Sequence, residues 1–142
     1  MPSFGKGSLM QLASCHPKLQ KVLLATINDG PDFTIVEGWR GKAAQDAAFA
    51  AGLSQKKWPE GNHNNIRNNQ PYSRAADIAP WPVDWKEGEK PHLRFAFLMG
   101  NLYAHAVVLG IKVRFGMDWN QNFIVDENFI DLPHVELAAD EV

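Results

Sequence analysis

The segment Asp131-Leu132-Pro133-His134-Val135-Glu136-Leu137 is the most informative part of this sequence. Residues 134–138 predict a strand. Side chains two residues apart in a strand point to the same face, so Glu136 would lie beside His134 as a partner for that histidine. Asp131 precedes His134 by three residues and can reach the same place without itself binding a metal. The segment therefore combines a candidate metal ligand with a candidate general base.

Two residues upstream can complete a metal site. Asp77 lies in the apolar strand predicted for residues 75–79, where an unpaired charge would be costly. It therefore needs either a structural ion pair or a metal. His63 lies in a polar loop, where a histidine is usually only solvated. Two histidines and one aspartate can hold zinc and leave its fourth position open for water, so the combination suggests a small zinc hydrolase.

The order of elements predicts an α+β fold with a small, mostly antiparallel sheet and helices packed on one side. An apolar periodicity indicates helix from 8 to 27, but Pro17 interrupts it, so we expect either two helices or a helix that starts at His16-Pro17. The apolar residues predicted along one side of the helix 91–109 are Leu93, Phe97, Leu98, Leu102, Ala106 and Leu109. The other predicted elements are strands 33–38, 75–79, 112–116 and 134–138, a helix over 41–51, and an irregular loop over 54–72.

Composition excludes several classes of protein. The 142 residues fit a single domain, 45% of them are hydrophobic, and the net charge of −2 argues against a nucleic-acid partner. No apolar run reaches the length of a membrane span, and the N-terminus lacks the apolar region of a signal peptide. We therefore expect no membrane insertion and synthesis in the cytoplasm. The lone Cys15 cannot form an intramolecular disulfide and is expected to pack in the core.

Nearly the whole chain resembles the phage endolysins that act as L-alanyl-D-glutamate peptidases. These belong with the D-Ala-D-Ala carboxypeptidase and dipeptidase-like zinc peptidases, so the resemblance implies a hedgehog/D-Ala-D-Ala peptidase-like fold. The matching segments are Phe4-Gly5-Lys6-Gly7-Ser8, residues 12–22, residues 32–40, Arg114-Phe115-Gly116-Met117-Asp118-Trp119-Asn120, and His134-Val135-Glu136-Leu137.

The resemblance implies roles for particular residues. Asp77 and His134 would bind one zinc ion per chain, and Asp131 would be the catalytic carboxylate. Arg40 would hold a substrate carbonyl or carboxylate. Its position one helical turn past Arg40, and not the resemblance, makes Gln45 a candidate for positioning the substrate. Three tryptophans either rim a substrate groove or pack against the sheet: Trp81, Trp85 and Trp119.

The first histidine of the family motif is displaced. It should lie seven residues before Asp77, but Gln70 occupies that position and Ser73 replaces the glycine of the motif. Either the loop carries an insertion and His63 supplies the ligand, or the ligand is lost and the protein is inactive. We favour His63, because residues 64–71 form a hydrophilic segment and loops tolerate insertions at little energetic cost.

Taken together, the sequence predicts one zinc peptidase domain over residues 1–142, with an inserted loop around 54–72. The expected activity is cleavage of the L-Ala–D-Glu bond of peptidoglycan during host lysis. A D-Ala-D-Ala carboxypeptidase or dipeptidase is the alternative enzyme, and a silent cell-wall-binding or virion structural relative is the alternative of another class. The resemblance further implies a monomer that waits in the host cytoplasm until a holin gives access to the wall.

Overall fold

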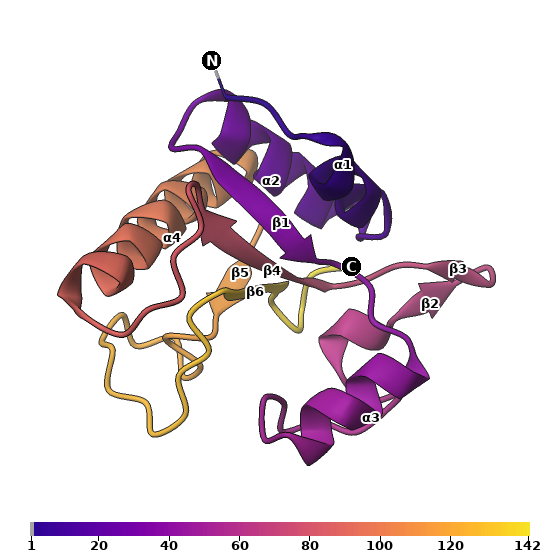
Figure 1. The fold of residues 1–142 in the computed structure, drawn as a ribbon. Coiled ribbons are helices and arrows are strands. Elements are labelled where there is room, and N and C mark those ends of the chain that lie inside the picture. The colour runs from indigo at the N-terminus through magenta and orange to yellow at the C-terminus, as the bar shows by residue number, and fades with distance from the viewer. Residues whose placement is uncertain (1) are drawn as a thin grey trace.

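A computed structural model describes residues 2–142 and contains one four-stranded antiparallel sheet with the order β1-β4-β6-β5 (Figure 1). Its strands are β1 (Phe33–Glu37), β4 (Ala75–Pro80), β5 (Val113–Phe115) and β6 (His134–Leu137). The helices of the described chain are α1 (Lys6–Ala13), α2 (Pro17–Asn28), α3 (Lys42–Ala50), α4 (Glu89–Leu109) and the short 3-10 helix η1 (Asn62–Asn64). The predicted α+β class and small antiparallel sheet are confirmed.

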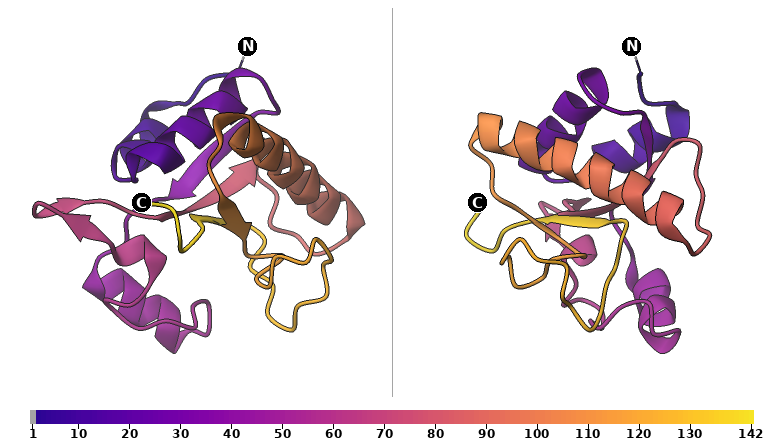
Figure 2. Two further views of the ribbon diagram at one scale, coloured as in Figure 1. Left: turned by 180° about the vertical axis from the view of Figure 1, so that it is seen from behind. Right: turned by 90° about the vertical axis from the view of Figure 1, so that its left-hand side faces the viewer.

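Helices α1, α2 and α4 pack on one face of the sheet, whereas α3 lies on the other side of the molecule (Figure 2). The core forms between that face and the three helices. Fully buried side chains from the strands, such as Ile78 and Val135, meet Leu19, Leu23 and Leu98 there. Burial of these apolar surfaces is the main stabilising contribution to the fold.

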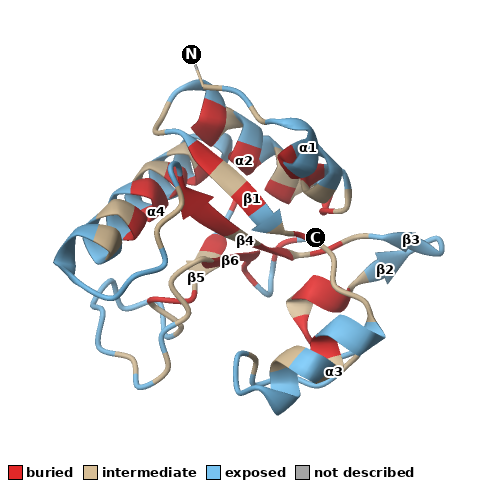
Figure 3. Ribbon diagram, in the orientation of Figure 1, coloured by how far each residue is buried: buried red, intermediate tan, exposed pale blue. Residues whose placement is uncertain are grey.

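The strand alternation separates an apolar face from a polar one. Ala76 and Ile78 of β4 and Val135 of β6 point into the core, and the residues between them point to the opposite face. Among those are Asp77 and His134. Figure 3 shows β4 and β6 as largely buried at the centre of the molecule, so these polar side chains leave the sheet in a sheltered position.

The helix predicted over residues 8–27 is divided into α1 and α2. Pro17 occupies the first position of α2, where its missing N–H leaves no hydrogen bond unmade. His16 caps this helix, since its Nδ1 accepts a hydrogen bond of 3.0 Å from the backbone N–H of Lys18. The break therefore follows from the proline, which was one of the two expected arrangements.

Helix α4 begins at Glu89, two residues before the predicted start at Pro91. Pro91 thus lies in the first turn, where a helix accepts proline. The prediction of which side of α4 faces the core was partly wrong. Leu93, Phe97 and Leu109 are exposed, and the spacing of three and four residues instead buries the stripe Phe95, Leu98, Met99, Leu102 and Ala106.

The loop predicted to be irregular over 54–72 contains η1 and a small hairpin. Strands β2 (Ile66–Arg67) and β3 (Gln70–Pro71) pair antiparallel across Asn68 and Asn69. Both asparagines have positive φ, of 51° and 61°, which suits a two-residue hairpin turn. This exposed hairpin extends away from the main sheet (Figure 1).

Cys15 packs in the core as expected, and burial raises the pKa of its thiol to about 12. The thiolate needed for nucleophilic chemistry is therefore disfavoured. Among residues 2–142, none of the helices has the length and apolar character required to cross a bilayer.

Replacing Leu98 with alanine should lower the free energy of unfolding by about 2–5 kcal/mol, because its side chain is fully buried beneath the sheet. Leu93→Ala on the same helix is the matched control. Leu93 is 58% exposed, so its removal should change stability by less than about 0.5 kcal/mol. Urea denaturation of both variants measures the difference, and equal losses would contradict the assigned core face.

Candidate metal centre

Two neighbouring strands bring Asp77 and His134 together. They are direct partners in the β4–β6 ladder, and both point to the face opposite the core. His63 reaches the same place from η1. The backbone N–H of Arg40 donates to the carbonyl of His63 at 2.8 Å, which ties η1 to the segment that follows β1.

The three side chains form a nearly regular triangle. His63 Nε2 lies 3.2 Å from His134 Nδ1 and 3.5 Å from Asp77 Oδ1, and His134 Nδ1 lies 3.4 Å from Asp77 Oδ1. Tetrahedral zinc bound at 2.0–2.1 Å has ligand atoms separated by about 3.3 Å. The triangle therefore has the size of one face of a zinc coordination shell. Among the described residues, His63, Asp77 and His134 form a group of side chains close enough together to hold a metal ion.

Each histidine uses one ring nitrogen for a hydrogen bond away from the triangle, which leaves its other ring nitrogen free to bind a metal. His63 donates from Nδ1 to the carbonyl of Gly38 at 2.7 Å, and His134 donates from Nε2 to Glu136 Oε1 at 2.7 Å. The lone pairs of His63 Nε2 and His134 Nδ1 thus face Asp77 Oδ1, which is buried without a hydrogen-bond partner. Such a convergence of electron-rich atoms is costly unless a cation joins it, so the donor set fits a metal.

The electrostatics of the site also favour positive charge. Burial raises the pKa of Asp77, but the adjacent imidazoles of His134 and His63 outweigh this and hold it well below its ordinary value. Burial lowers the pKa of His134, but the carboxylates of Asp77 and Glu136 outweigh this and raise it to about 9. The carboxylates of the site are therefore ionised, and cations are stabilised beside them.

Asp131 lies at the edge of this triangle. Its Oδ2 is 3.9 Å from His134 Nδ1, the nitrogen that faces Asp77 and His63. Burial raises the pKa of Asp131, and the nearby charge of Asp77 raises it further. The result is a carboxylate that is more basic than a solvated aspartate and partly open to solvent, which suits a proton acceptor.

Gly116 positions this carboxylate, although the sequence analysis did not single it out. Its N–H donates to the carbonyl of His134, and its carbonyl accepts from the N–H of Asp131, both at 2.9 Å. A Cβ at this position would lie 2.1 Å from the carbonyl oxygen of Asp131. The glycine at the end of the strand predicted over 112–116 was the available signal, but the close approach that requires it is tertiary.

Arg40 is held against Asp77 by a partly buried network. Its guanidinium pairs with Glu37, donates to Gln45 Oε1 at 3.0 Å, and lies 3.3 Å from Asp77 Oδ2. Gln45 is 1% exposed, so it contacts Arg40 and does not open directly to a substrate. Asn64 completes the network, because its Nδ2 donates to the Arg40 carbonyl and to Gln45 Oε1.

Glu136, which accepts the hydrogen bond of His134, is itself held in place by hydrogen bonds from two other residues. Its Oε2 accepts hydrogen bonds of 2.8 Å from Asn62 Nδ2 and from Arg114. Burial raises the pKa of Glu136, but the hydrogen bond from His134 outweighs this and lowers it. The sequence pattern placed Glu136 beside His134, whereas Asn62 and Arg114 were not identified as its partners.

The remaining candidates lie in different environments. Gln70 is exposed in β3, while His63 is 5% exposed within the triangle. Trp119 packs against the site, with its ring centroid 5.1 Å from that of His134. Trp81 and Trp85 are exposed in the connection between β4 and α4.

Comparisons with known proteins agree with this arrangement. The model of the family described as phage L-alanyl-D-glutamate peptidase matches residues 2–138. The L-alanyl-D-glutamate peptidase of Escherichia phage T5 is 36% identical over 121 residues, which cover 82% of this chain and 81% of that protein. The crystal structure of the Serratia marcescens L-Ala D-Glu endopeptidase ChiX has the same fold, with a TM-score of 0.72, 23% identity, and coverage of 96% of this chain and 91% of that one. This chain therefore belongs to the phage L-alanyl-D-glutamate peptidase family.

Proposed function

We propose that this protein is a zinc-dependent endopeptidase that cleaves peptidoglycan stem peptides between L-alanine and D-glutamate. His63 Nε2, Asp77 Oδ1 and His134 Nδ1 would hold one zinc ion. The observation that carries this proposal is the triangle of these three atoms, whose edges of 3.2–3.5 Å match a tetrahedral zinc site. The family and its named members support the choice of bond.

Bound zinc would act as a Lewis acid and lower the pKa of water near it. Asp131 would accept a proton from the attacking water and pass it to the leaving amine of D-glutamate. Arg40 would face the negative charge of the substrate, since its guanidinium is fixed by Glu37 and Gln45 and lies next to Asp77. Glu136 and the carbonyl of Gly38 would keep each histidine in the tautomer that binds the metal.

The remaining parts of the proposal concern the whole protein. One catalytic domain would occupy residues 1–142, with the insertion in the loop 54–72 contributing the β2–β3 hairpin. The enzyme would act as a monomer and reach the cell wall from the host cytoplasm after a holin has opened the membrane. The family supports this phage lysis role.

Incubation with bare sacculi, with and without a zinc chelator, tests the reaction. We expect stem peptides with D-glutamate at their N-terminus, identified by mass spectrometry, and their loss when the chelator is present. Free D-alanine would instead indicate the carboxypeptidase alternative. Binding to sacculi without any product, with zinc supplied, would indicate the silent relative.

His63→Ala should remove both stoichiometric zinc and activity, because the triangle loses one corner. Gln70→Ala is the matched control and should keep both, since Gln70 is exposed in the hairpin. Metal content after dialysis, measured by elemental analysis, distinguishes the two residues. Retention of zinc by His63→Ala, or its loss from Gln70→Ala, would contradict the proposed ligand.

Asp131→Asn should lower kcat by about 10²–10⁴-fold while leaving zinc bound, because an amide cannot accept the proton. The substitution keeps the shape of the side chain and leaves its backbone hydrogen bonds to Gly116 and His134 in place. Turnover on isolated muropeptides and metal content are measured together. Full activity, or loss of the metal, would be inconsistent with a role as general base.

A further inference from the structure

Trp85 is an exposed aromatic platform beside the site. It lies in the connection between β4 and α4 and is 57% exposed. Phe95, which is almost fully buried, supports the indole, with ring centroids 5.7 Å apart and planes inclined at 36°. A large aromatic side chain held in place from below and open to solvent is typical of a ligand contact.

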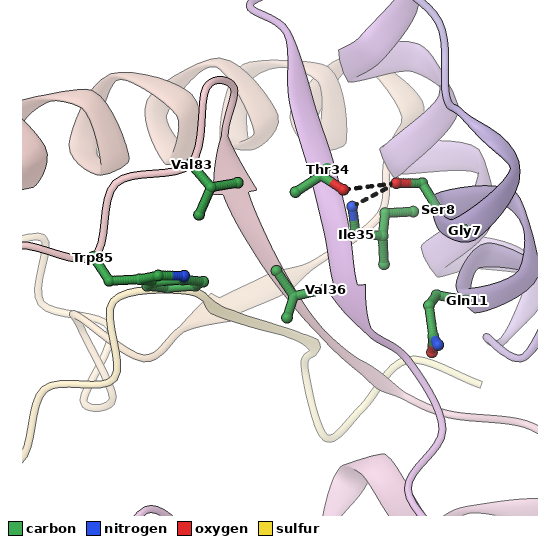
Figure 4. Close-up of a pocket in the computed structure, with 8 residues that line it drawn as sticks. All are labelled: Gly7, Ser8, Gln11, Thr34, Ile35, Val36, Val83 and Trp85. Carbon is green, nitrogen blue, oxygen red and sulfur yellow. Dashed lines mark hydrogen bonds between the residues drawn. The ribbon is translucent and has the colours of Figure 1, made fainter.

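Two hollows meet at Trp85. The first, of about 420 Å³, lies between Trp85, Val83 and Val36, and Figure 4 shows the indole extending toward Val36 in this hollow. The second, of about 240 Å³, lies between Trp85 and Leu132 and includes Asp131 in its lining. Because Asp131 borders both the second hollow and the ligand triangle, a substrate in the site can extend directly onto Trp85.

Arg40 and Trp85 reach the ligand triangle at different corners. Arg40 lies 3.3 Å from Oδ2 of Asp77 and lines neither hollow. Asp131, whose Oδ2 is 3.9 Å from His134 Nδ1, lines the second hollow together with Trp85. A peptide bound across the triangle therefore has one side toward Arg40, at the Asp77 corner, and the other toward Trp85, at the His134 corner.

The charges near Arg40 and near Trp85 determine which side of the substrate lies against each of them. A glutamyl residue within a peptide retains one carboxyl group that is not used in the chain, so the D-glutamate side suits the guanidinium of Arg40. The Trp85 end carries Asp84, Glu87 and Asp131 against Lys86. That excess of acidic groups disfavours an anion and suits an uncharged group.

We infer that Trp85 and these two hollows bind the muramic acid sugar that precedes L-alanine in peptidoglycan. This inference rests on the proposed function. The amino group of L-alanine is acylated by the lactyl group of that sugar, so the sugar lies on the Trp85 side and carries no charge there. Its C–H faces can pack on the indole, while Asp84 and Lys86 offer polar partners for its hydroxyl and acetamido groups.

The test compares two substrates of the same peptide sequence. One is a disaccharide-peptide, and the other is the stem peptide with an N-acetyl group in place of the sugar. Trp85→Ala should lower kcat/KM about tenfold for the disaccharide-peptide, the scale of one aromatic contact, and leave it unchanged for the acetyl-peptide. Trp81→Ala is the control, because Trp81 is 61% exposed but lines neither hollow.

Equal losses on both substrates, or no loss on either, would overturn the sugar assignment. Thermal unfolding and zinc content establish that the variants are folded, and Trp85→Phe should restore part of the activity. Binding of the free disaccharide, followed through the indole N–H signal of Trp85 by NMR, does not require cleavage. If the unmodified protein cleaves neither substrate, the proposed function fails, but the NMR experiment still tests the sugar site. A shift of the Trp85 indole signal on addition of the disaccharide would support that site, and no shift would overturn it.

Discussion

The arrangement of the site depends on one buried carboxylate oxygen, Oδ1 of Asp77. It lies on the central strand β4 without a hydrogen-bond partner, and two imidazole nitrogens face it at 3.4 and 3.5 Å. A buried anion beside two lone pairs is unfavourable by itself, and it becomes favourable when a cation joins the three atoms. This makes the triangle a ready metal site and places the site on the polar face of the sheet.

The contacts around the triangle determine which atoms face it. Gly38 and Glu136 accept the N–H of His63 and of His134, respectively, and Arg40 engages the other oxygen of Asp77. Gly38 and Arg40 follow β1, His63 lies in η1 and Glu136 lies in β6, so the donor geometry depends on packing between these three segments. The buried amides of Gln45 and Asn64 extend this support into α3.

The proposed insertion would be accommodated outside the core. The β2–β3 hairpin lies outside the main sheet, so residues inserted there would alter neither the core nor the β4–β6 register. His63 precedes the hairpin and is anchored by the backbone hydrogen bond from Arg40. A surface loop can therefore move a candidate ligand along the sequence while the space it occupies stays the same.

The sequence by itself determined the α+β class, the strand that carries His134 and Glu136, and the candidates Asp77 and Asp131. These follow from local signals, namely apolar periodicity, proline positions and short motifs, which depend on residues close in the chain. Only the tertiary structure decided that His63 and not Gln70 faces His134, 71 residues away. It also decided that Gly116 supports Asp131 and that Trp85 borders the site. These facts depend on the meeting of distant segments, which local propensity does not encode.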